Sequence, residues 1–181
     1  TTTAQSVNVT IINDNKVENA EIYNVGLNTL NASGRNVTLG TSAGTGTITN
    51  EDAAVVSFAP SGGVSLMEGN TGQTPFVFTA TLDNPVQGGF MLAYTTSDGT
   101  ATIANNDYVD NDGTLTFAGT MGEAQLITIN VNGDFIVEND ETFTVALGSI
   151  TGAPAGVTIA GSPKTGIIEN DELDYGDAPD P

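Results

Sequence analysis

The chain of 181 residues carries 22 acidic and 3 basic side chains, a formal net charge of −19, and it contains neither His nor Cys. The missing thiols exclude a disulfide framework and a thiolate metal site, and the missing imidazole removes the commonest catalytic base. So much negative charge argues against binding to nucleic acids and anionic membranes, since both need basic patches. Two interpretations remain: a solvated acidic coat, as in proteins from salty habitats, or carboxylates that gather around divalent cations.

Short segments in which apolar and polar residues alternate predict β-strands. In chain order, the best-defined predicted strands are 55–58, 76–82, 90–95, 115–117, 127–131, 143–147 and 164–168. Turn-forming pairs such as Asn84-Pro85 and Asn132-Gly133 separate them. About seven short strands with one apolar face predict an all-β, immunoglobulin-like Greek-key sandwich. No apolar run approaches the ~20 residues of a membrane-spanning helix, and no signal peptide is recognisable.

The chain contains an internal repeat. Residues 5–52 align without a gap with residues 125–172, an offset of 120 positions. We therefore predict the C-terminal half of one repeat at 1–52, a complete repeat at 53–172, and an acidic, Pro-containing linker to a following module at 173–181. A half-repeat has exposed strand edges, so we expect the N-terminus to correspond to the middle of a longer tandem array, in which a neighbour covers them.

Acidic residues gather in turns and at strand ends of the complete repeat. The groups are Glu68; Asp98, Asp107, Asp110 and Asp112; Asp134, Glu138, Asp140 and Glu141; and Glu169, Asp171 and Glu172. Calcium takes about six to eight oxygen ligands, which several loops at one end of a sandwich can supply. Crowded carboxylates without a cation would repel and raise one another's pKa. The half-repeat keeps the acidic turn and strand end, which favours a shared role over solubility alone.

Several motifs together resemble the Calx-β repeat. They are Asp98-Gly-Thr-Ala101, Asn106-Asp107-Tyr108, Gly113-Thr-Leu-Thr-Phe117, Gly133-Asp134, Glu138-Asn-Asp-Glu-Thr-Phe143 and Ile168-Glu-Asn-Asp171. The likeness spans about 55–172, and its second half recurs over 5–52. The family occurs in sodium–calcium exchangers, in integrin β4 and in many bacterial surface proteins. The resemblance implies an immunoglobulin-like sandwich that binds calcium in loops at one end, near the junction with the next domain.

The resemblance also implies a set of calcium ligands. In the complete repeat these are Glu68, Asp107, Asp134, Glu138, Glu141, Asn170, Asp171 and Glu172; in the half-repeat they are Asp14, Glu18, Glu21, Asn50, Glu51 and Asp52. The sequence departs from the strongest calcium sensors at Gly133 and Phe135, where those have Asp, and at Asn170 in the terminal triplet. Fewer charged ligands imply weaker binding or fewer ions.

We expect a non-catalytic, calcium-binding structural or adhesive repeat of a long extracellular surface protein, in which calcium stiffens the junctions between repeats. Its partners would be neighbouring repeats and a surface glycan or protein receptor. The tail at 174–181 resembles a segment of large surface proteins from marine and gliding bacteria. Two alternatives are a regulatory calcium sensor and a glycan- or protein-binding module whose specificity lies in loops such as 60–75 or 98–113. Paired carboxylates can hydrolyse glycosides, but the absence of Trp leaves no aromatic platform for a sugar.

Overall fold

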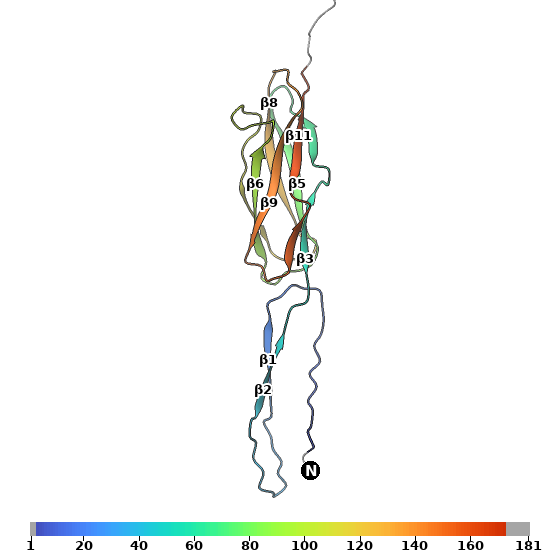
Figure 1. The fold of residues 1–181 in the computed structure, drawn as a ribbon, viewed down its shortest axis with the longest axis vertical. Coiled ribbons are helices and arrows are strands. Elements are labelled where there is room, and N and C mark those ends of the chain that lie inside the picture. Colours follow the sequence, from blue (N-terminus) through green and yellow to red (C-terminus); the bar gives the residue numbers. More distant parts are fainter. Residues whose placement is uncertain (1–2, 173–181) are drawn as a thin grey trace, which may run out of the picture.

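The computed structural model describes residues 3–172 and divides into two parts that lie end to end (Figure 1). The larger part is a β-sandwich, and the smaller part is an N-terminal hairpin accompanied by an extended segment. The predicted linker at 173–181 lies outside the described residues. No helix within 3–172 is long and apolar enough to cross a membrane. The strands are β1 (Glu21–Gly26), β2 (Ala43–Ile48), β3 (Ala54–Ala59), β4 (Val64–Met67), β5 (Gly72–Leu82), β6 (Phe90–Asp98), β7 (Gly113–Phe117), β8 (Ala124–Gly133), β9 (Glu141–Thr151), β10 (Val157–Ala160) and β11 (Lys164–Glu169).

Two sheets form the sandwich, with strand orders β10-β3-β5-β8 and β4-β11-β9-β6-β7. Successive side chains of a strand point to opposite faces, so every second residue can face the other sheet. Phe76 and Phe78 of β5, Ile129 of β8, and Phe143 and Val145 of β9 are buried in this way. The rings of Phe76 and Phe78 meet Phe143 across the sheets, with centroids 5.6 and 6.5 Å apart. The predicted all-β sandwich is confirmed.

The sandwich has nine strands, two more than the seven predicted. The additional strands, β4 and β10, have four residues each and pair in parallel, β4 with β11 and β10 with β3. Because Pro60, Gly62 and Gly63 separate β3 from β4, the chain passes here from one sheet to the other. Strands this short carry too little alternation to be recognised in the sequence.

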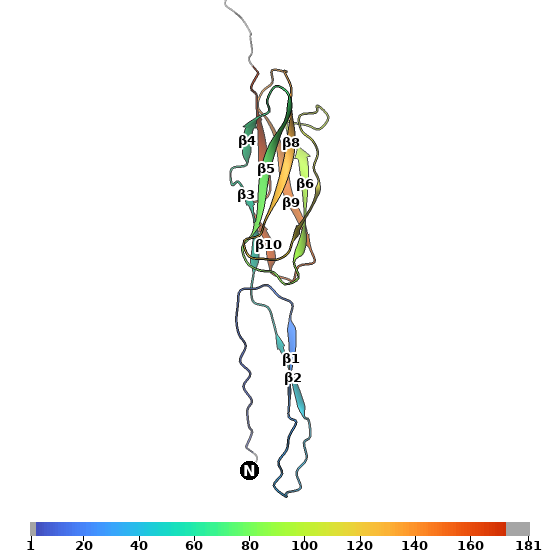
Figure 2. The same cartoon turned by 180° about the vertical axis from the view of Figure 1, so that it is seen from behind.

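The N-terminal hairpin reproduces part of the sandwich. Its pairing Val25↔Gly44 is the counterpart of Val145↔Lys164 between β9 and β11, displaced by the repeat offset. In both copies an aromatic ring covers a glycine of the partner strand: Tyr23 lies over Gly46, as Phe143 lies over Gly166. Residues 5–13, the counterparts of β8, form no strand in the described structure and run beside the hairpin (Figure 2).

The hairpin part meets the sandwich at the end where β3 begins (Figure 1). Val17 forms a parallel bridge with Val86 and is fully buried among sandwich residues. Its N–H donates to the carbonyl of Pro85 at 2.9 Å, and its carbonyl accepts from the N–H of Gln87 at 2.8 Å. One valine of the half-repeat is therefore part of the core of the next repeat.

Candidate metal centre

The predicted acidic turns meet at the end of the sandwich far from the hairpin (Figure 1). Three segments reach this end: the β4–β5 turn with Glu68, the β8–β9 turn over 134–140, and residues 170–172 after β11. The parallel pairing of β4 with β11, which ends at Met67↔Glu169, places the first and the last of these segments side by side. Asp107 joins them because Asn132 of β8 donates its N–H to the carbonyl of Asp107 at 2.9 Å.

One group of carboxylates consists of Glu68, Asp171 and Glu172, whose ligand oxygens lie within 4.8 Å of one another. Glu68 is buried, with only 5% of its surface exposed. The N–H of Gly69 donates to Asp171 Oδ1 at 3.1 Å, and Asn70 Nδ2 donates to Glu172 Oε1 at 3.2 Å. These bonds hold the strand-end acids against the β4–β5 turn and orient them toward Glu68.

A second group consists of Asp107, Glu138 and Glu141, also with ligand oxygens within 4.8 Å of one another. Asp107 is buried, and its Oδ2 accepts a hydrogen bond from the N–H of Thr102 at 2.7 Å. Glu141 opens β9, whereas Glu138 is exposed in the turn before it. Both groups are composed entirely of residues predicted from the sequence.

Burial and mutual repulsion raise the pKa of several of these acids. Burial raises the pKa of Glu68 to about 7, and the charges of Asp134 and Glu172 add to the effect. Burial also raises the pKa of Glu141 to about 7, helped by the charge of Asp107 and a hydrogen bond to it. The pKa of Glu138 is raised by burial and by the charges of Asp107 and Asp134. Since the charge of Asp134 acts on both Glu68 and Glu138, it couples the two groups electrostatically.

The remaining predicted residues shape the turn between β8 and β9. Asp134 Oδ1 accepts from the N–H of Ile136 at 2.6 Å, and Asn170 Oδ1 accepts from the N–H of Glu138 at 3.0 Å. Asn170 Nδ2 also donates to the carbonyl of Glu172 at 3.0 Å. The Asn170 side chain therefore connects the turn to the strand-end acids, which gives a structural role to a residue predicted as a ligand.

Gly133 has a role that the sequence analysis did not identify. A Cβ at this position would overlap the carbonyl oxygen of Gly69, the residue after Glu68. The close approach of β8 to the β4–β5 turn therefore requires glycine at this position. The repeat alignment gave no signal for this role, because the partner of Gly133 belongs to the half of the repeat that is present only once.

The donor set fits a hard cation such as calcium. All six side chains of the two groups offer carboxylate oxygens, the ligands that calcium prefers. Glu172 Oε2 is buried and has no hydrogen-bond partner among the described residues. A buried acceptor without a partner is costly, and a cation would satisfy it. The three basic residues are Lys16 and Arg35 in the half-repeat and Lys164, which begins β11, whereas the acids follow the other end of that strand.

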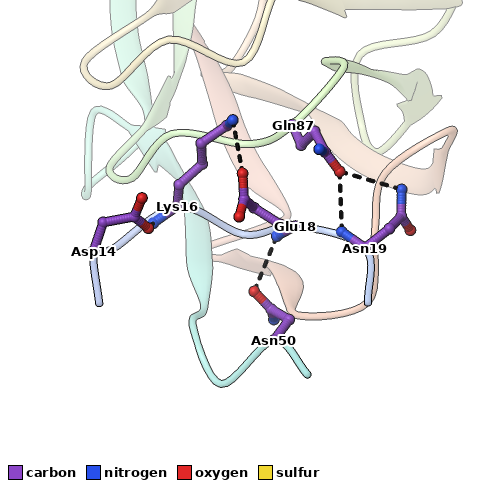
Figure 3. A network of polar contacts seen from close by, with 6 residues as sticks. All are labelled: Asp14, Lys16, Glu18, Asn19, Asn50 and Gln87. Atoms are coloured by element: carbon purple, nitrogen blue, oxygen red, sulfur yellow. Dashed lines mark hydrogen bonds and ion pairs between the residues drawn. The ribbon is translucent and has the colours of Figure 1, made fainter. Parts of the chain in front are cut away.

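The half-repeat carries the same turn but not the same grouping. Asp14, Glu18, Glu21, Asn50, Glu51 and Asp52 all line one hollow beside the junction. The N–H groups of Lys16 and Glu18 donate to Asp14 Oδ1 and Asn50 Oδ1, each at 2.9 Å (Figure 3). Within the described residues these acids form no group at ligand spacing. The counterparts of Glu68 and Asp107 would come from the other half of that repeat, and Lys16 forms an ion pair with Glu18 at 2.8 Å.

The loop at 98–113, considered for ligand specificity, is tied down by internal hydrogen bonds. The hydroxyl of the buried Tyr108 donates to Asp98 Oδ1 at 2.6 Å. The hydroxyl of Thr96 donates to Asp110 Oδ1 at 2.5 Å, and its N–H donates to Asp112 Oδ1 at 2.8 Å. These three acids therefore serve the architecture of the loop.

Comparison with known proteins places this geometry in a family. The model of the family described as Calx-beta domain matches residues 1–54 and 50–171. Curated protein sequences give no match.

Three solved structures are similar. For the apo form of the Calx CBD1 domain, the TM-score is 0.56 and the identity 27%, covering 67% of this chain and 100% of that one. The CBD12 structure from CALX1.2 gives a TM-score of 0.54 and an identity of 28%, covering 65% of this chain and 46% of that one. The calcium binding domain CBD12 of CALX1.1 gives a TM-score of 0.52 and an identity of 26%, covering 66% of this chain and 44% of that one. This chain therefore spans less than half the length of those two CBD12 chains. Because the family model matches nearly all of the described residues, the chain belongs to the Calx-beta domain family.

Proposed function

We propose that this chain is a non-catalytic, calcium-binding structural module of a long extracellular surface protein, and that calcium stiffens the junctions between its repeats. The observation that carries the proposal is the convergence of two carboxylate groups, from four separate segments, at one end of the sandwich. Asp107 and Glu68 are almost fully buried there. An acidic coat that served only solubility would leave its carboxylates in water, where their repulsion is small.

The raised pKa values of Glu68 and Glu141 give a physical reason for a cation at this end of the sandwich. A carboxyl with a pKa near 7, as at Glu68 and Glu141, is costly to ionise without a nearby positive charge. A divalent cation removes that cost by compensating several charges at once. The similarity to a solved structure named as a calcium binding domain supports calcium as the cation.

The two groups suggest which residues would hold the ion or ions. Glu68, Asp171 and Glu172 would bind one, and Asp107, Glu138 and Glu141 a second, with the charge of Asp134 acting on both groups. When bound, calcium would supply positive charge and coordination bonds that hold these loops together. The protein residues provide the rest: the hydrogen bonds of Asn170, Asn70 and Gly69 hold the loops in position before binding.

The predicted affinity is that of an extracellular module. Calcium binding in such modules typically falls at ~10⁻⁴–10⁻³ M, weaker than in regulatory sensors. By the resemblance, Gly133 and Phe135 stand where the strongest sensors have Asp, and Asn170 takes the place of an acid in the terminal triplet. Gly133 cannot be replaced without displacing Gly69. The regulatory sensor remains the second candidate because of the similarity to the Calx CBD structures. Calorimetry distinguishes the two by affinity, since a sensor would bind at ~10⁻⁷–10⁻⁵ M.

Thermal unfolding of the whole chain tests the proposal. A ligand that binds only the folded state stabilises it by about 2.7 kcal/mol at a hundredfold excess over Kd. We expect the unfolding midpoint to rise by several degrees between EDTA and saturating calcium, and to rise less in magnesium, which prefers a smaller octahedral site. Equal midpoints in EDTA and calcium would refute a calcium role.

A further inference from the structure

We propose that the exposed turn at 134–139, here called the distal turn, is a docking site for a further copy of this repeat. The docked segment of that copy would be the loop equivalent to Asn84–Gln87. This inference deepens the proposed repeat-to-repeat junction, but it rests on backbone geometry and not on calcium.

The half-repeat shows how such docking occurs. Its own turn at 14–19, the proximal turn, is the sequence counterpart of the distal turn. Val17 of the proximal turn is fully buried and exchanges two backbone hydrogen bonds with Pro85 and Gln87. The N–H of Asn19 donates to Gln87 Oε1 at 3.1 Å, which extends the contact by two residues (Figure 3).

The distal turn has the same internal structure as the proximal turn. Ile136 N–H to Asp134 Oδ1 repeats the bond of Lys16 to Asp14, and Glu138 N–H to Asn170 Oδ1 repeats that of Glu18 to Asn50. The two turns differ in what lies outside them. Val137, the counterpart of Val17, is 51% exposed and makes no backbone hydrogen bond with the described residues. The distal turn is therefore already shaped for the contact that the proximal turn makes.

The start of the connection to a following repeat is also alike in the two copies. Asn50 Nδ2 donates to the carbonyl of Asp52 at 2.9 Å, immediately before β3 begins at Ala54. Asn170 Nδ2 donates to the carbonyl of Glu172 at 3.0 Å in the same way. A repeat whose Ala53 followed Glu172 directly, in place of the predicted linker at 173–181, would therefore begin beside the distal turn as β3 begins beside the proximal turn.

The distal turn differs from the proximal turn in two side chains, and this difference specifies the occupant. Asn15 Nδ2 donates to Asn84 Oδ1 at 3.1 Å, whereas its counterpart is Phe135, which is 71% exposed. Lys16 is replaced by Ile136, which is also exposed. Asn84 Nδ2 also donates to the carbonyl of Ala53 at 2.9 Å, so a partner that buries Phe135 would leave only the amide oxygen at that position without a hydrogen bond, a cost that an apolar residue avoids. The geometry therefore favours a repeat with an apolar residue at that position.

A tandem fusion tests the inference. Residues 53–172 are attached a second time, directly after Glu172, once with the native sequence and once with Asn84→Leu in the added copy. Amide hydrogen exchange is measured at Val137 and at Gln87 of the added copy, in EDTA and in millimolar calcium. Val17, in the same molecule, provides the docked reference, and the unfused chain provides the undocked one. The NMR amide spectrum of the added copy is compared with that of the sandwich in the unfused chain, to check that the added copy is folded.

We expect exchange at Val137 to slow by at least about tenfold in the fusion, toward the rate at Val17, and more with Asn84→Leu than without it. Val137→Asp in the fusion should restore fast exchange at Gln87 of the added copy. Protection in EDTA supports docking independent of calcium, and protection only in calcium supports docking that the metal centre assists. Fast exchange at Val137 in both fusions and both buffers would overturn the proposal, while leaving any calcium affinity measured by calorimetry intact.

Discussion

The half-repeat and the complete repeat carry the same sequence pattern with opposite burial. Ile129 of β8 is fully buried, whereas its counterpart Val9 is 44% exposed. Yet the hairpin β1–β2 has the register of β9 and β11, and Tyr23 covers Gly46 as Phe143 covers Gly166. Register and local ring packing are therefore encoded within the C-terminal half, whereas burial depends on the opposite sheet, which the other half supplies.

The acidic turn shows the same contrast between what the C-terminal half determines alone and what depends on the other half of the repeat. Two hydrogen bonds within the turn occur in both copies, because both of their partners lie in the C-terminal half. Among residues 3–172, carboxylates cluster at ligand spacing only in the complete repeat, where Glu68 and Asp107 are present. A half-repeat thus keeps the shape of the turn but lacks the site.

Phe143→Ala and Tyr23→Ala should separate the two copies most strongly. Phe143 is fully buried and contacts the rings of Phe76, Phe78 and Tyr108. Truncating a buried Phe typically costs about 3–5 kcal/mol of unfolding free energy. Tyr23→Ala should change the unfolding of the sandwich by less than about 0.5 kcal/mol. Urea titrations of both variants measure the difference, and similar losses would mean that the half-repeat shares one cooperative core with the sandwich.

Gly133→Ala should be the next largest effect. The added methyl group would overlap the Gly69 carbonyl, and overpacking of this kind costs about 1–3 kcal/mol. Calcium affinity should fall as well, because the displaced turn carries Glu68. Gly44→Ala in β2 is the control, since a Cβ there meets nothing within 4 Å. Unfolding curves and calorimetry on both variants check the expectation, which fails if Gly133→Ala is as stable as Gly44→Ala.

Glu141→Gln should weaken calcium binding by about tenfold, or 1.4 kcal/mol. Gln keeps the shape of the side chain but removes one charge from the group with Asp107 and Glu138. The matched change Glu21→Gln, at the counterpart position, should leave the calorimetric affinity within about twofold of the original. If both changes weaken binding equally, the half-repeat holds a site of its own.

The smallest predicted effect concerns pH. The folded pKa of Glu68 and Glu141, about 7, lies above the ordinary value of 4.5, so the folded state holds these protons more tightly than the unfolded state. The resulting stability is fully present below pH 4.5 and is lost as pH rises through about 7. Without calcium, the unfolding midpoint should therefore fall progressively across this window.

Two variants and one ligand sharpen the pH experiment. Replacing both Glu68 and Glu141 by Gln should flatten the decline, whereas Glu21→Gln should leave it unchanged. Saturating calcium should reverse the trend, because protons then compete with the metal at low pH. A decline that persists in the double variant would have to come from the general negative charge.

The sequence predicts the seven longer strands because Phe143, Val145 and Leu147, and the similar series in the other strands, alternate clearly. It misses β4 and β10 because their pairing is set by neighbours distant in the chain: Val64 pairs with Gly166, and Val157 with Ala54. A strand of four residues at a sheet edge is determined mainly by its partner.

For the candidate site, acidic residues and turns are visible in the sequence, and all six members of the two carboxylate groups were predicted. The burial of Glu68 was not predicted, because it depends on the close approach of Gly133 to Gly69. The burial of Val17 was equally hidden, since the contacted Val86 lies in a different repeat. The division into a half-repeat, a complete repeat and a linker stays a prediction.

The passage from β2 to β3 uses only residues 49–53. Five residues span at most ~17 Å when fully extended. A string of sandwiches joined in this way gains almost no contour length when pulled, because there is no slack linker to straighten. With Val17 inserted into the adjacent sandwich, the joint also resists bending. Such a string behaves mechanically as a jointed rod of nearly fixed reach, and it can lengthen substantially only when a sandwich unfolds.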